Sequence, residues 1–495
     1  MKYQLLMLIT SFLITTQSYA GKYQLLENSY KELMKSNVPA LMDIETKQLS
    51  TQLQKSKFKE SFQAQAYVNY GHSDTKEKSM IPFQPIFKTS NQYEVGLKKN
   101  TMYGVSVDLS QSVDTRSGDS ETGSTYNDIH TTIYELGMNI SLWKDFLGIN
   151  SRRNFKNLQE LELQSKKEEL ISRKIVGLNF RKIYWALVAN QEKTEITNSL
   201  LKTSLKQAKD AKRRQASSVS DKAEVAIFES KVSQRKGQLL YLKHEKELLL
   251  KNLRELFPEL NNKELALASY NKQGATAEIL ACSGKILVDS SIPFEKSEYN
   301  NVVELLKSQK NRQSKIDQNH DDIDLNLQLK YQQKGLSSNS DDNTNFEGDY
   351  TDSLDDLSDN DRSGMSAALS LVIPLGKTAK TTKELQEKIN EKRYYSQITF
   401  LKNQLVSTHT QVRRSMGILA EVIEAQKKNS KQLNIRVKEM KKKYSQARIP
   451  EYALFQDQEA LLQSDILIID TQLQIINTLL DYYSVFQNYP CKFNL

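Results

Sequence analysis

Two stretches of this chain are helical in pattern over many more residues than a helix in a globular domain. From about residue 151 to 212 the sequence contains no proline and a single glycine, Gly177. A second stretch of this kind runs from about residue 379 to 443. At 1.5 Å per residue, about 60 helical residues span roughly 90 Å. A helix of that length needs a helical neighbour to pack against, so the chain favours a long helical assembly.

Composition supports this interpretation. The chain has 495 residues, of which only 17 are glycine and 8 are proline, and 26% are charged. Scarce helix breakers and abundant charge are typical of long helices with solvated faces. The formal net charge of +9 is read as part of that solvated surface, because no basic stripe interleaved with aromatic residues indicates nucleic-acid binding.

Each long helix is followed by a short break and by a return helix about half as long. The first break, near residues 215–220, precedes a helix that begins at Asp221, and the second contains Pro450 and precedes a helix from Glu451. Shorter helices, 28–57 and 297–316, come before the strand segments of each half. The same order of elements therefore occurs twice, which indicates an internal structural duplication.

Segments with a period of two precede each long helix. Residues 62–72 and 133–143 alternate in the first half, and residues 323–333 and 365–375 in the second. Alternating segments of about 10 residues fit the strands of a membrane barrel. The segment 93–113 alternates as well, and it either lengthens the rim of such a barrel or forms a separate hairpin.

Two polar segments are predicted to be loops. Residues 114–128 have the composition of a loop, and the acidic segment 340–362 is interpreted as a solvated extracellular loop.

The predicted organisation is a signal peptide at 1–20; a first repeat at 21–256 with strands in 61–143, a long helix at 151–213 and a return helix at 221–256; an inter-repeat linker at 257–296; a second repeat at 297–486 with strands in 323–375, a long helix at 379–446 and a return helix at 451–486; and a tail at 487–495.

The first twenty residues have the layout of a secretory signal peptide. Lys2 precedes an apolar run, and Ser18 and Ala20 flank Tyr19 at a small-residue cleavage site. The apolar run is too short to span a bilayer, so we expect an exported protein.

No pattern of an active site is found. Cys282 and Cys491 do not form a CxxC motif, the five histidines are scattered, and nucleotide-binding, nucleophile-elbow and zinc-protease motifs do not occur. We therefore predict no enzyme activity, no cofactor and no metal site.

The ordered duplicate set of motifs resembles the TolC family of outer-membrane efflux proteins. "MNISLWKDFLGINSRRNFKNL" is similar to the first strand-to-helix passage of that family, and "SLVIPLGKTAKTTKELQEK", with Pro374 and Leu375, to the second. "YSQARIPEYALFQDQEALL" is similar to the tip of the second helical hairpin, and the first tip matches at Ser218 and Asp221.

The resemblance implies a mainly α fold with membrane β. Three chains would share a β-barrel of twelve strands in the outer membrane and build a long α-helical barrel in the periplasm. The homotrimer would be the passive exit duct of a tripartite efflux or type I secretion system, gated at its periplasmic tip, with a periplasmic adaptor protein and an inner-membrane pump as partners. The alternative from the residues alone is an exported coiled-coil structural or adhesin-like scaffold, which would not need two sets of strands.

The resemblance also implies roles for residues at the two tips. Asp221 and Tyr444 fall on positions of the closed-state network, and Arg448 lies one position from the family's arginine. The structural alternatives are a helix N-cap for Asp221, packing for Tyr444 and solvation for Arg448. The glycine usual at the tips falls here on Gln215 and Ala447.

Ion preference at the periplasmic entrance is a further expectation. The family's aspartate ring aligns with Ala453 and Gln456, with Asp457 next to it, and the helix ends nearby are basic. Acidic rings favour cations. Because the aligned positions are not acidic here and the nearby helix ends are basic, we expect an entrance that is only weakly cation-selective or that tolerates anions. Cys282 and Cys491 are in regions that, by the resemblance, gather around the middle of the family's helical tube, so we predict a disulfide between them in an oxidising compartment.

Overall fold

The structure is a computed structural model of the chain. The ranges that it describes are 22–36, 38–75, 86–119, 125–218, 222–268, 270–288, 294–319, 323–337, 350–358, 362–373 and 377–486. The predicted signal peptide, the tail 487–495, Asp221, Pro374 and Leu375 lie outside these ranges.

The chain divides into two compact units. The helical unit comprises residues 1–47, 166–303 and 398–495, and the sheet unit comprises residues 48–165 and 304–397. Four helices contribute residues to both: α2 (Pro39–Glu60), α3 (Ile149–Ala216), α6 (Asn300–Asn319) and α8 (Lys377–Ser445).

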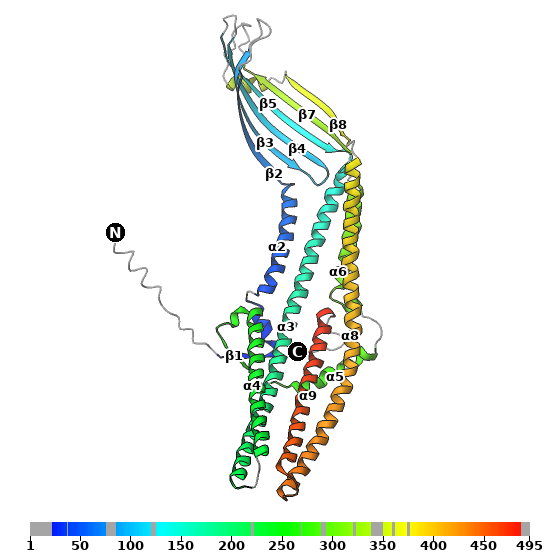
Figure 1. The fold of residues 1–495 in the computed structure, drawn as a ribbon. Helices are drawn as coiled ribbons and strands as arrows, with labels where there is room; N and C mark the ends of the chain where they lie inside the picture. The colour runs from blue at the N-terminus through cyan, green and yellow to red at the C-terminus, as the bar shows by residue number, and fades with distance from the viewer. Residues whose placement is uncertain are drawn as a thin grey trace, which may run out of the picture. The chain divides into compact units, whose positions relative to one another are not determined.

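The helical unit contains two antiparallel hairpins, α3 with α4 (Lys222–Leu256) and α8 with α9 (Glu451–Val485), as Figure 1 shows. The α3 and α8 helices are 68 and 69 residues long, whereas each return helix has 35. The unit's smaller elements are β1 (Lys22–Leu25), η1 (Glu27–Ser29), α1 (Tyr30–Leu33), η3 (Pro258–Leu260), β6 (Glu264–Leu267), α5 (Lys272–Val288) and η4 (Phe294–Lys296).

The core of the helical unit lies between these helices. Phe180 of α3, Phe257 after α4 and Tyr482 of α9 are fully buried, and one continuous apolar cluster joins them to Met416 of α8. The β1 strand pairs in parallel with β6, so the linker between the two repeats is tied to the start of the described chain.

The sheet unit is built on one six-stranded antiparallel sheet with the strand order β2-β3-β4-β5-β7-β8. Its strands are β2 (Ala64–Asp74), β3 (Ile86–Asn100), β4 (Val105–Asp119), β5 (Thr125–Ser141), β7 (Asp324–Leu336) and β8 (Ser363–Val372). The short η2 (Phe146–Gly148) leads into α3, and α7 (Tyr350–Ser358) packs on β7 and β5.

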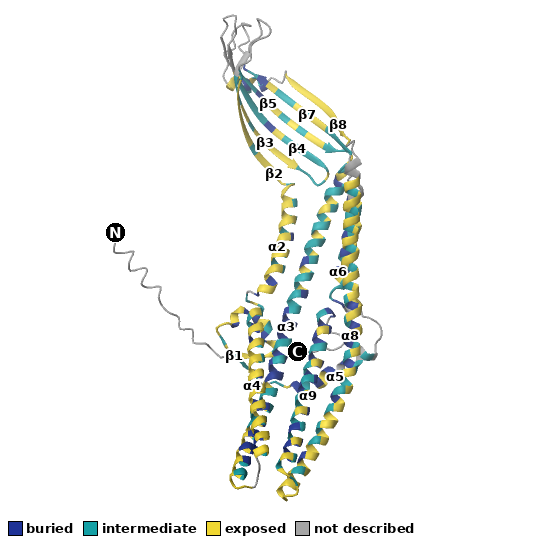
Figure 2. Ribbon diagram, in the orientation of Figure 1, coloured by how far each residue is buried: buried dark blue, intermediate teal, exposed yellow. Residues whose placement is uncertain are grey.

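The two faces of this sheet differ in chemistry, because alternate side chains point to opposite faces of a strand. On one face, Val68, Val95, Leu136 and Met365 belong to a set of large apolar side chains that are exposed. On the other face, Glu135 forms an ion pair with Lys330 at 2.6 Å. Figure 2 shows the edge strands β2 and β8 as largely exposed.

Three expectations about these elements are wrong. The predicted helix 28–57 is interrupted: α1 ends at Leu33 and α2 begins at Pro39, because proline fits only the first turn of a helix. Most of the predicted loop 114–128 is strand, since β4 continues to Asp119 and β5 begins at Thr125. Part of the predicted acidic loop 340–362 is α7, whose apolar Leu357 is buried.

Within the described residues, the first half of the chain therefore supplies four strands of the six-stranded sheet, not the two that the resemblance implies, and 93–113 covers parts of β3 and β4 and the turn between them. The predicted fold class, mainly helical with long helices and an antiparallel sheet, is confirmed. Among the described residues, no helix is both long and apolar enough to cross a membrane.

Candidate functional site: the tips of the helical hairpins

The second hairpin turns through a backbone motif that ends α8 sharply. Ala447 has a positive φ of 55°. Its N–H donates to the carbonyl of Tyr444 at 2.9 Å, and the N–H of Arg448 donates to the carbonyl of Lys443 at 2.9 Å. These two bonds define a Schellman motif. Ala447 thus occupies the left-handed position that glycine usually takes, as the alignment of the tip predicts.

The first hairpin ends its long helix differently from the expectation. Gln215 is still part of α3, which continues to Ala216. The left-handed residue is Ser218, with φ 57°, and its N–H donates to the carbonyl of Gln215 at 2.9 Å. Glutamine and alanine are good helix formers, so the helix runs past the position that was expected to carry the turn.

A small apolar cluster joins the two hairpins near their tips. Phe228 of α4 and Phe455 of α9 are fully buried, and their ring centroids are 5.9 Å apart in an edge-to-face arrangement. Ala211 of α3 and Val225 of α4 complete the contact with Ala208. Edge-to-face pairs contribute beyond their buried area, so this cluster holds the tips together.

Arg214 forms an ion-pair bridge across the same two hairpins. Its guanidinium lies 2.5 Å from a carboxylate oxygen of Glu451 on α9 and 2.7 Å from one of Glu224 on α4. The hydrogen bond with Glu451 is the main cause that raises the pKa of Arg214. The carboxylate of Glu451 is also placed in the first turn of α9, where the helix dipole favours negative charge.

A second cross-hairpin pair is buried. Arg235 of α4 is 1% exposed and forms an ion pair with Glu459 of α9, which is 8% exposed. Lys231 lies 3.2 Å from the same carboxylate, and Gln238 accepts a hydrogen bond from Arg235 at 2.5 Å. Removing one partner of a buried pair leaves a charge without compensation, so this contact is a strong constraint on the position of α9.

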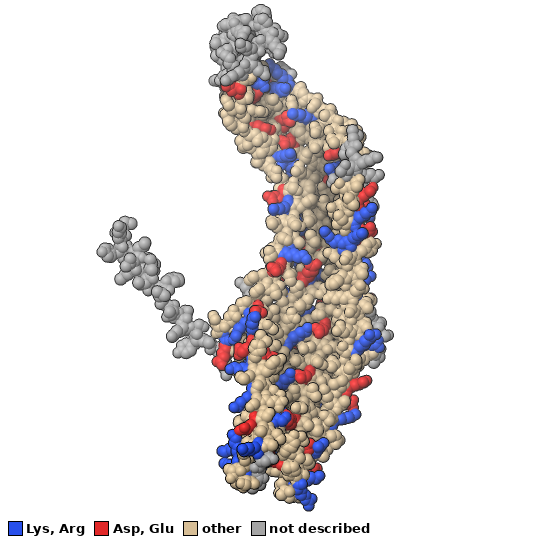
Figure 3. All heavy atoms as spheres, viewed as in Figure 1, with Lys and Arg blue, Asp and Glu red and all other residues tan. Residues whose placement is uncertain are grey.

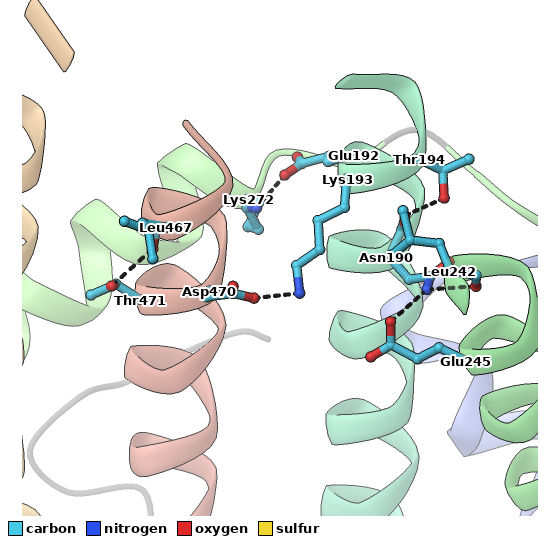
Figure 4. Close-up of polar contacts among 10 residues, drawn as sticks. All are labelled: Asn190, Glu192, Lys193, Thr194, Leu242, Glu245, Lys272, Leu467, Asp470 and Thr471. Carbon is cyan, nitrogen blue, oxygen red and sulfur yellow. Dashed lines mark hydrogen bonds and ion pairs between the residues drawn. The ribbon is translucent and has the colours of Figure 1, made fainter. Parts of the chain in front are cut away.

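The pattern continues along α9. Asp470 and Asp481 form ion pairs with Lys193 and Lys182 of α3, and Figure 4 shows Lys193 pointing at Asp470. In each cross-hairpin pair the cation comes from the first hairpin and the carboxylate from α9. We call the set Arg214–Glu451, Arg235–Glu459, Lys193–Asp470 and Lys182–Asp481 the α9 ladder.

Glu192 and Asn190 of α3 make further polar contacts with neighbouring helices in the same close-up (Figure 4). Lys272 at the start of α5 is 3% exposed and pairs with Glu192 of α3. Burial lowers the pKa of Lys272, and the carboxylate of Glu192 acts against that shift. Asn190 donates to the carbonyl of Leu242 at 3.0 Å and to Glu245 at 2.9 Å, both on α4.

The residues that the resemblance singled out take unequal positions. Tyr444 is 39% exposed, and Arg448 is exposed and has no ion pair with any described residue. Asp457 is buried and receives two contacts of 2.9 Å from the guanidinium of Arg436 on α8. Asp221 lies outside the described residues. The gating roles of Asp221, Tyr444 and Arg448 therefore stay predictions, since no contact of the described residues tests them.

The predicted disulfide also stays a prediction. Cys282 belongs to α5 by its backbone, but its side chain and the whole of Cys491 lie outside what the structure describes. Within the described ranges, no group of three or more His, Cys, Asp or Glu side chains could hold a metal ion.

Basic side chains gather at the ends of both hairpins, as Figure 3 shows. Lys209 and Lys443 are exposed and have no ion pair with a described residue, whereas Lys212 pairs with Glu229 at 2.5 Å and Lys442 with Glu439 at 2.8 Å. Because Asp457 is already paired with a cation, the described tips carry more uncompensated positive than negative charge.

Reasoning from the sequence missed the α9 ladder. A signal was available, because Lys182 and Lys193 are separated by 11 residues and so are Asp470 and Asp481. Eleven residues are close to three helical turns. Equal spacings of opposite charge on two antiparallel helices place both pairs in register.

Comparison with known proteins identifies the fold. No protein-family model and no curated protein sequence matches the chain. Solved structures do match, at low sequence identity. The Campylobacter jejuni CmeC outer membrane channel aligns with a TM-score of 0.60 and 12% identity, over 95% of this chain and 89% of that one. The outer membrane protein VceC from Vibrio cholerae aligns with a TM-score of 0.59 and 12% identity, over 92% of this chain and 95% of that one.

The open state of the Neisseria gonorrhoeae MtrE outer membrane channel aligns with a TM-score of 0.58 and 12% identity, over 92% of this chain and 88% of that one. The resemblance to the TolC family that the sequence indicates is therefore confirmed at the level of the fold: this chain has the fold of these outer-membrane channels.

Proposed function

We propose that the chain is the outer-membrane channel of a tripartite efflux or type I secretion system. The observation that carries this proposal is the sheet, which exposes a broad apolar face and a polar, ion-paired opposite face. Soluble monomers rarely expose large contiguous apolar patches. Strands of a membrane barrel instead place apolar side chains toward lipid and polar ones toward the lumen.

The edges of the sheet support assembly with further copies. Among the described strands, β2 and β8 have only one neighbour each. In lipid, unpaired backbone N–H and C=O groups cost several kcal/mol each, so an open sheet edge is not stable there. We propose that three copies join through these edges into one closed barrel, which is the homotrimer that the resemblance implies.

Aromatic residues at one end of the sheet fit a membrane interface. Trp143 and Phe146, where β5 passes into α3, are 54% and 47% exposed, and Tyr103 in the turn between β3 and β4 is 63% exposed. The guanidinium of Arg152 lies 5.8 Å from the ring centre of Tyr103. Exposed aromatic rings beside cationic groups are typical of the headgroup level of a membrane.

The tips of the helical hairpins are the proposed gate. The bridge Arg214–Glu451 lies between the two hairpins and both partners are close to their tips, so separation of the hairpins must break it. The pair Arg235–Glu459 lies farther from the tips, and we propose that it remains formed when the tips separate. A periplasmic adaptor protein and an inner-membrane pump are the proposed partners, and they would supply the energy and the cargo.

A fractionation and bilayer experiment tests the channel. The mature protein should partition with the outer membrane, migrate as a trimer that converts to monomer on heating, and conduct ions in a planar bilayer. A soluble, almost entirely helical protein that remains monomeric after cross-linking would contradict the proposal and favour the exported scaffold.

A further inference from the structure

The two halves of the chain contribute unequal numbers of strands to the sheet. The second half supplies β7 and β8, whereas the first half supplies β2, β3, β4 and β5. In both halves a helix precedes the strands, and a long helix and a return helix follow them. The two strands of the second half therefore represent the basic unit. The hairpin β3–β4 is therefore the additional element, and its place in the assembly needs an explanation.

The additional hairpin is continuous with the rest of the sheet. A row of directly paired residues crosses all six strands, each residue being the register partner of the next: Ala66, Leu97, Leu109, Leu136, Tyr331 and Met365. Every member of this row is apolar or aromatic, so β3 and β4 continue the exposed apolar face at this level of the sheet. Toward the opposite ends of the strands α7 packs on the same face, where Ser353 contacts Thr132 and lies against Gly335. The β3–β4 hairpin also reaches the helix-side end of the sheet, because Lys99 near its turn pairs with Ala64, the first residue of β2.

The turn of the additional hairpin is built into the passage from sheet to helix. Gly104 in the turn and Gly148 before α3 both have positive φ, 73° and 70°. A Cβ atom on Gly104 would lie 2.2 Å from the carbonyl oxygen of Asp145, and one on Gly148 would lie 1.7 Å from that of Met102. The N–H of Ser141 donates to the carbonyl of Gly104 at 2.8 Å.

Asp145, whose carbonyl lies against Gly104, also caps the long helix α3. Its carboxylate accepts hydrogen bonds from the backbone N–H groups of Asn150 at 2.8 Å and Ser151 at 3.1 Å, in the first turn of α3. One short segment thus caps the long helix and receives the turn of the hairpin. A hairpin that only extended from the extracellular rim would not reach this junction.

The number of strands per copy allows closure. Adjacent strands are antiparallel throughout, so β2 at one edge and β8 at the other run in opposite directions. The β2 strand of one copy can therefore pair in antiparallel fashion with β8 of the next. Both edges place apolar residues on the same face, Val68 on β2 and Leu369 on β8, so the apolar band continues across the joint.

We propose that β3 and β4 are wall strands of the membrane barrel, so that three copies of six strands each form a barrel of eighteen strands. This inference rests on the proposed function. Barrel diameter grows roughly linearly with strand number, so this wall is about one and a half times as wide as one of twelve strands. With a barrel of this width, the outer-membrane part of the duct would not limit the size of the cargo. The tips of the helical hairpins would then be the narrowest part of the duct.

Lipid exposure of single positions tests the placement of the hairpin. Nitroxide labels on Leu97 of β3 and Leu109 of β4 should collide with oxygen more than with a water-soluble nickel complex, as labels on Val68 of β2 and Leu369 of β8 should. If the labels on β3 and β4 were accessible to nickel while those on β2 and β8 were in lipid, the inference would be overturned and the proposed function would stand. Water exposure at all four positions would overturn both.

Matched positions on the opposite face serve as controls. Labels on Glu94 of β3 and Ser112 of β4, which are register partners on the polar face, should be accessible to the nickel complex. All labels are placed in full-length trimer with Cys282→Ser and Cys491→Ser, so that only the introduced cysteine reacts.

Deletion of residues 86–119 tests the width. It removes β3 and β4 and brings Ala66 beside Leu136 with both on the apolar face, because an even number of strands is lost. The largest neutral polymer that enters from the extracellular side should become smaller in diameter by about one third. An unchanged cut-off in a trimer that still assembles would contradict the inference, and if the variant does not assemble, the label accessibilities decide.

Discussion

The sheet and the helical unit place the same kinds of side chain in opposite environments. In the helical unit, the large apolar residues Phe180, Phe257 and Tyr482 are fully buried. In the sheet, Val68 is 75% exposed and Met365 is 85% exposed. A core buried between helices stabilises the first region in water, whereas the second gains nothing from its apolar face until lipid covers it.

Charged residues follow the same contrast. The helical unit uses them between hairpins, in the α9 ladder, where each pair joins helices that are far apart in the sequence. The sheet uses them within its polar face, where Glu135 accepts contacts from Lys330 at 2.6 Å and Gln332 at 3.2 Å on the adjacent strand. The ladder therefore specifies how the two hairpins pack against each other. The ion pairs of the sheet only stabilise strands that backbone hydrogen bonds already join.

The largest expected effect comes from the buried pair of the ladder. Glu459→Gln should destabilise the helical unit by about 3–5 kcal/mol, because Arg235 then remains buried without its partner charge. The double variant Glu459→Leu with Arg235→Met should recover most of that loss. Thermal unfolding of the helical signal in detergent measures both.

An exposed pair provides the control for this experiment. Glu424 and Lys428 on α8 are 70% and 76% exposed in their side chains, and Glu424→Gln should change stability by about 0–1 kcal/mol. A loss in Glu459→Gln no larger than in Glu424→Gln would show that the ladder does not constrain α9.

The apolar face of the sheet should be sensitive to charge in a way that the polar face is not. Leu329→Lys on β7 should destabilise the assembled barrel by about 2–4 kcal/mol, because the ammonium group would face lipid. Gln328→Lys, at the next residue and on the opposite face, should be tolerated. The temperature at which the trimer dissociates on a gel compares the two, and equal effects would contradict the assignment of the faces.

The junction between sheet and helix should not accept a side chain at Gly148. Gly148→Ala should cost about 1–3 kcal/mol or more, because its φ of 70° is strained for alanine and the new Cβ would meet the Met102 carbonyl. Gly137→Ala is the matched control, since its Cβ would make an ordinary contact of 3.7 Å with Asp108. Trimer yield and melting temperature distinguish the variants, and similar values would refute the tight junction.

The smallest effect on stability is expected at the tips, where the functional effect should be clear. Glu451→Gln removes the carboxylate that faces Arg214, and because Arg214 is partly exposed the loss should be about 1 kcal/mol or less. The resting conductance in a planar bilayer should nevertheless rise, since the two hairpins separate more easily. Glu439→Gln, which affects only a pair within α8, should leave the conductance unchanged.

The sequence alone predicted the order of elements because its signals are local. Long helical runs, the breaks near Ser218 and Pro450, and alternation in 62–72 and 323–333 all depend on period and propensity over a few residues. It was misled in 114–128, where side chains on both faces of the strands are polar. Serine, threonine, aspartate and glycine in 114–128 are typical of a loop in water, but the structure places most of them in two long strands.

What only the tertiary structure decided is which distant residues meet. Arg235 and Glu459 are separated by 224 positions, and the row from Ala66 to Met365 depends on the register of six strands at once. The same is true of Gly104 and Gly148, because a side chain at Gly104 would meet the backbone of Asp145 and one at Gly148 would meet the backbone of Met102. Such pairings follow from the packing of whole helices and strands, whereas periodicity and turn signals report only which face each residue occupies within its own element.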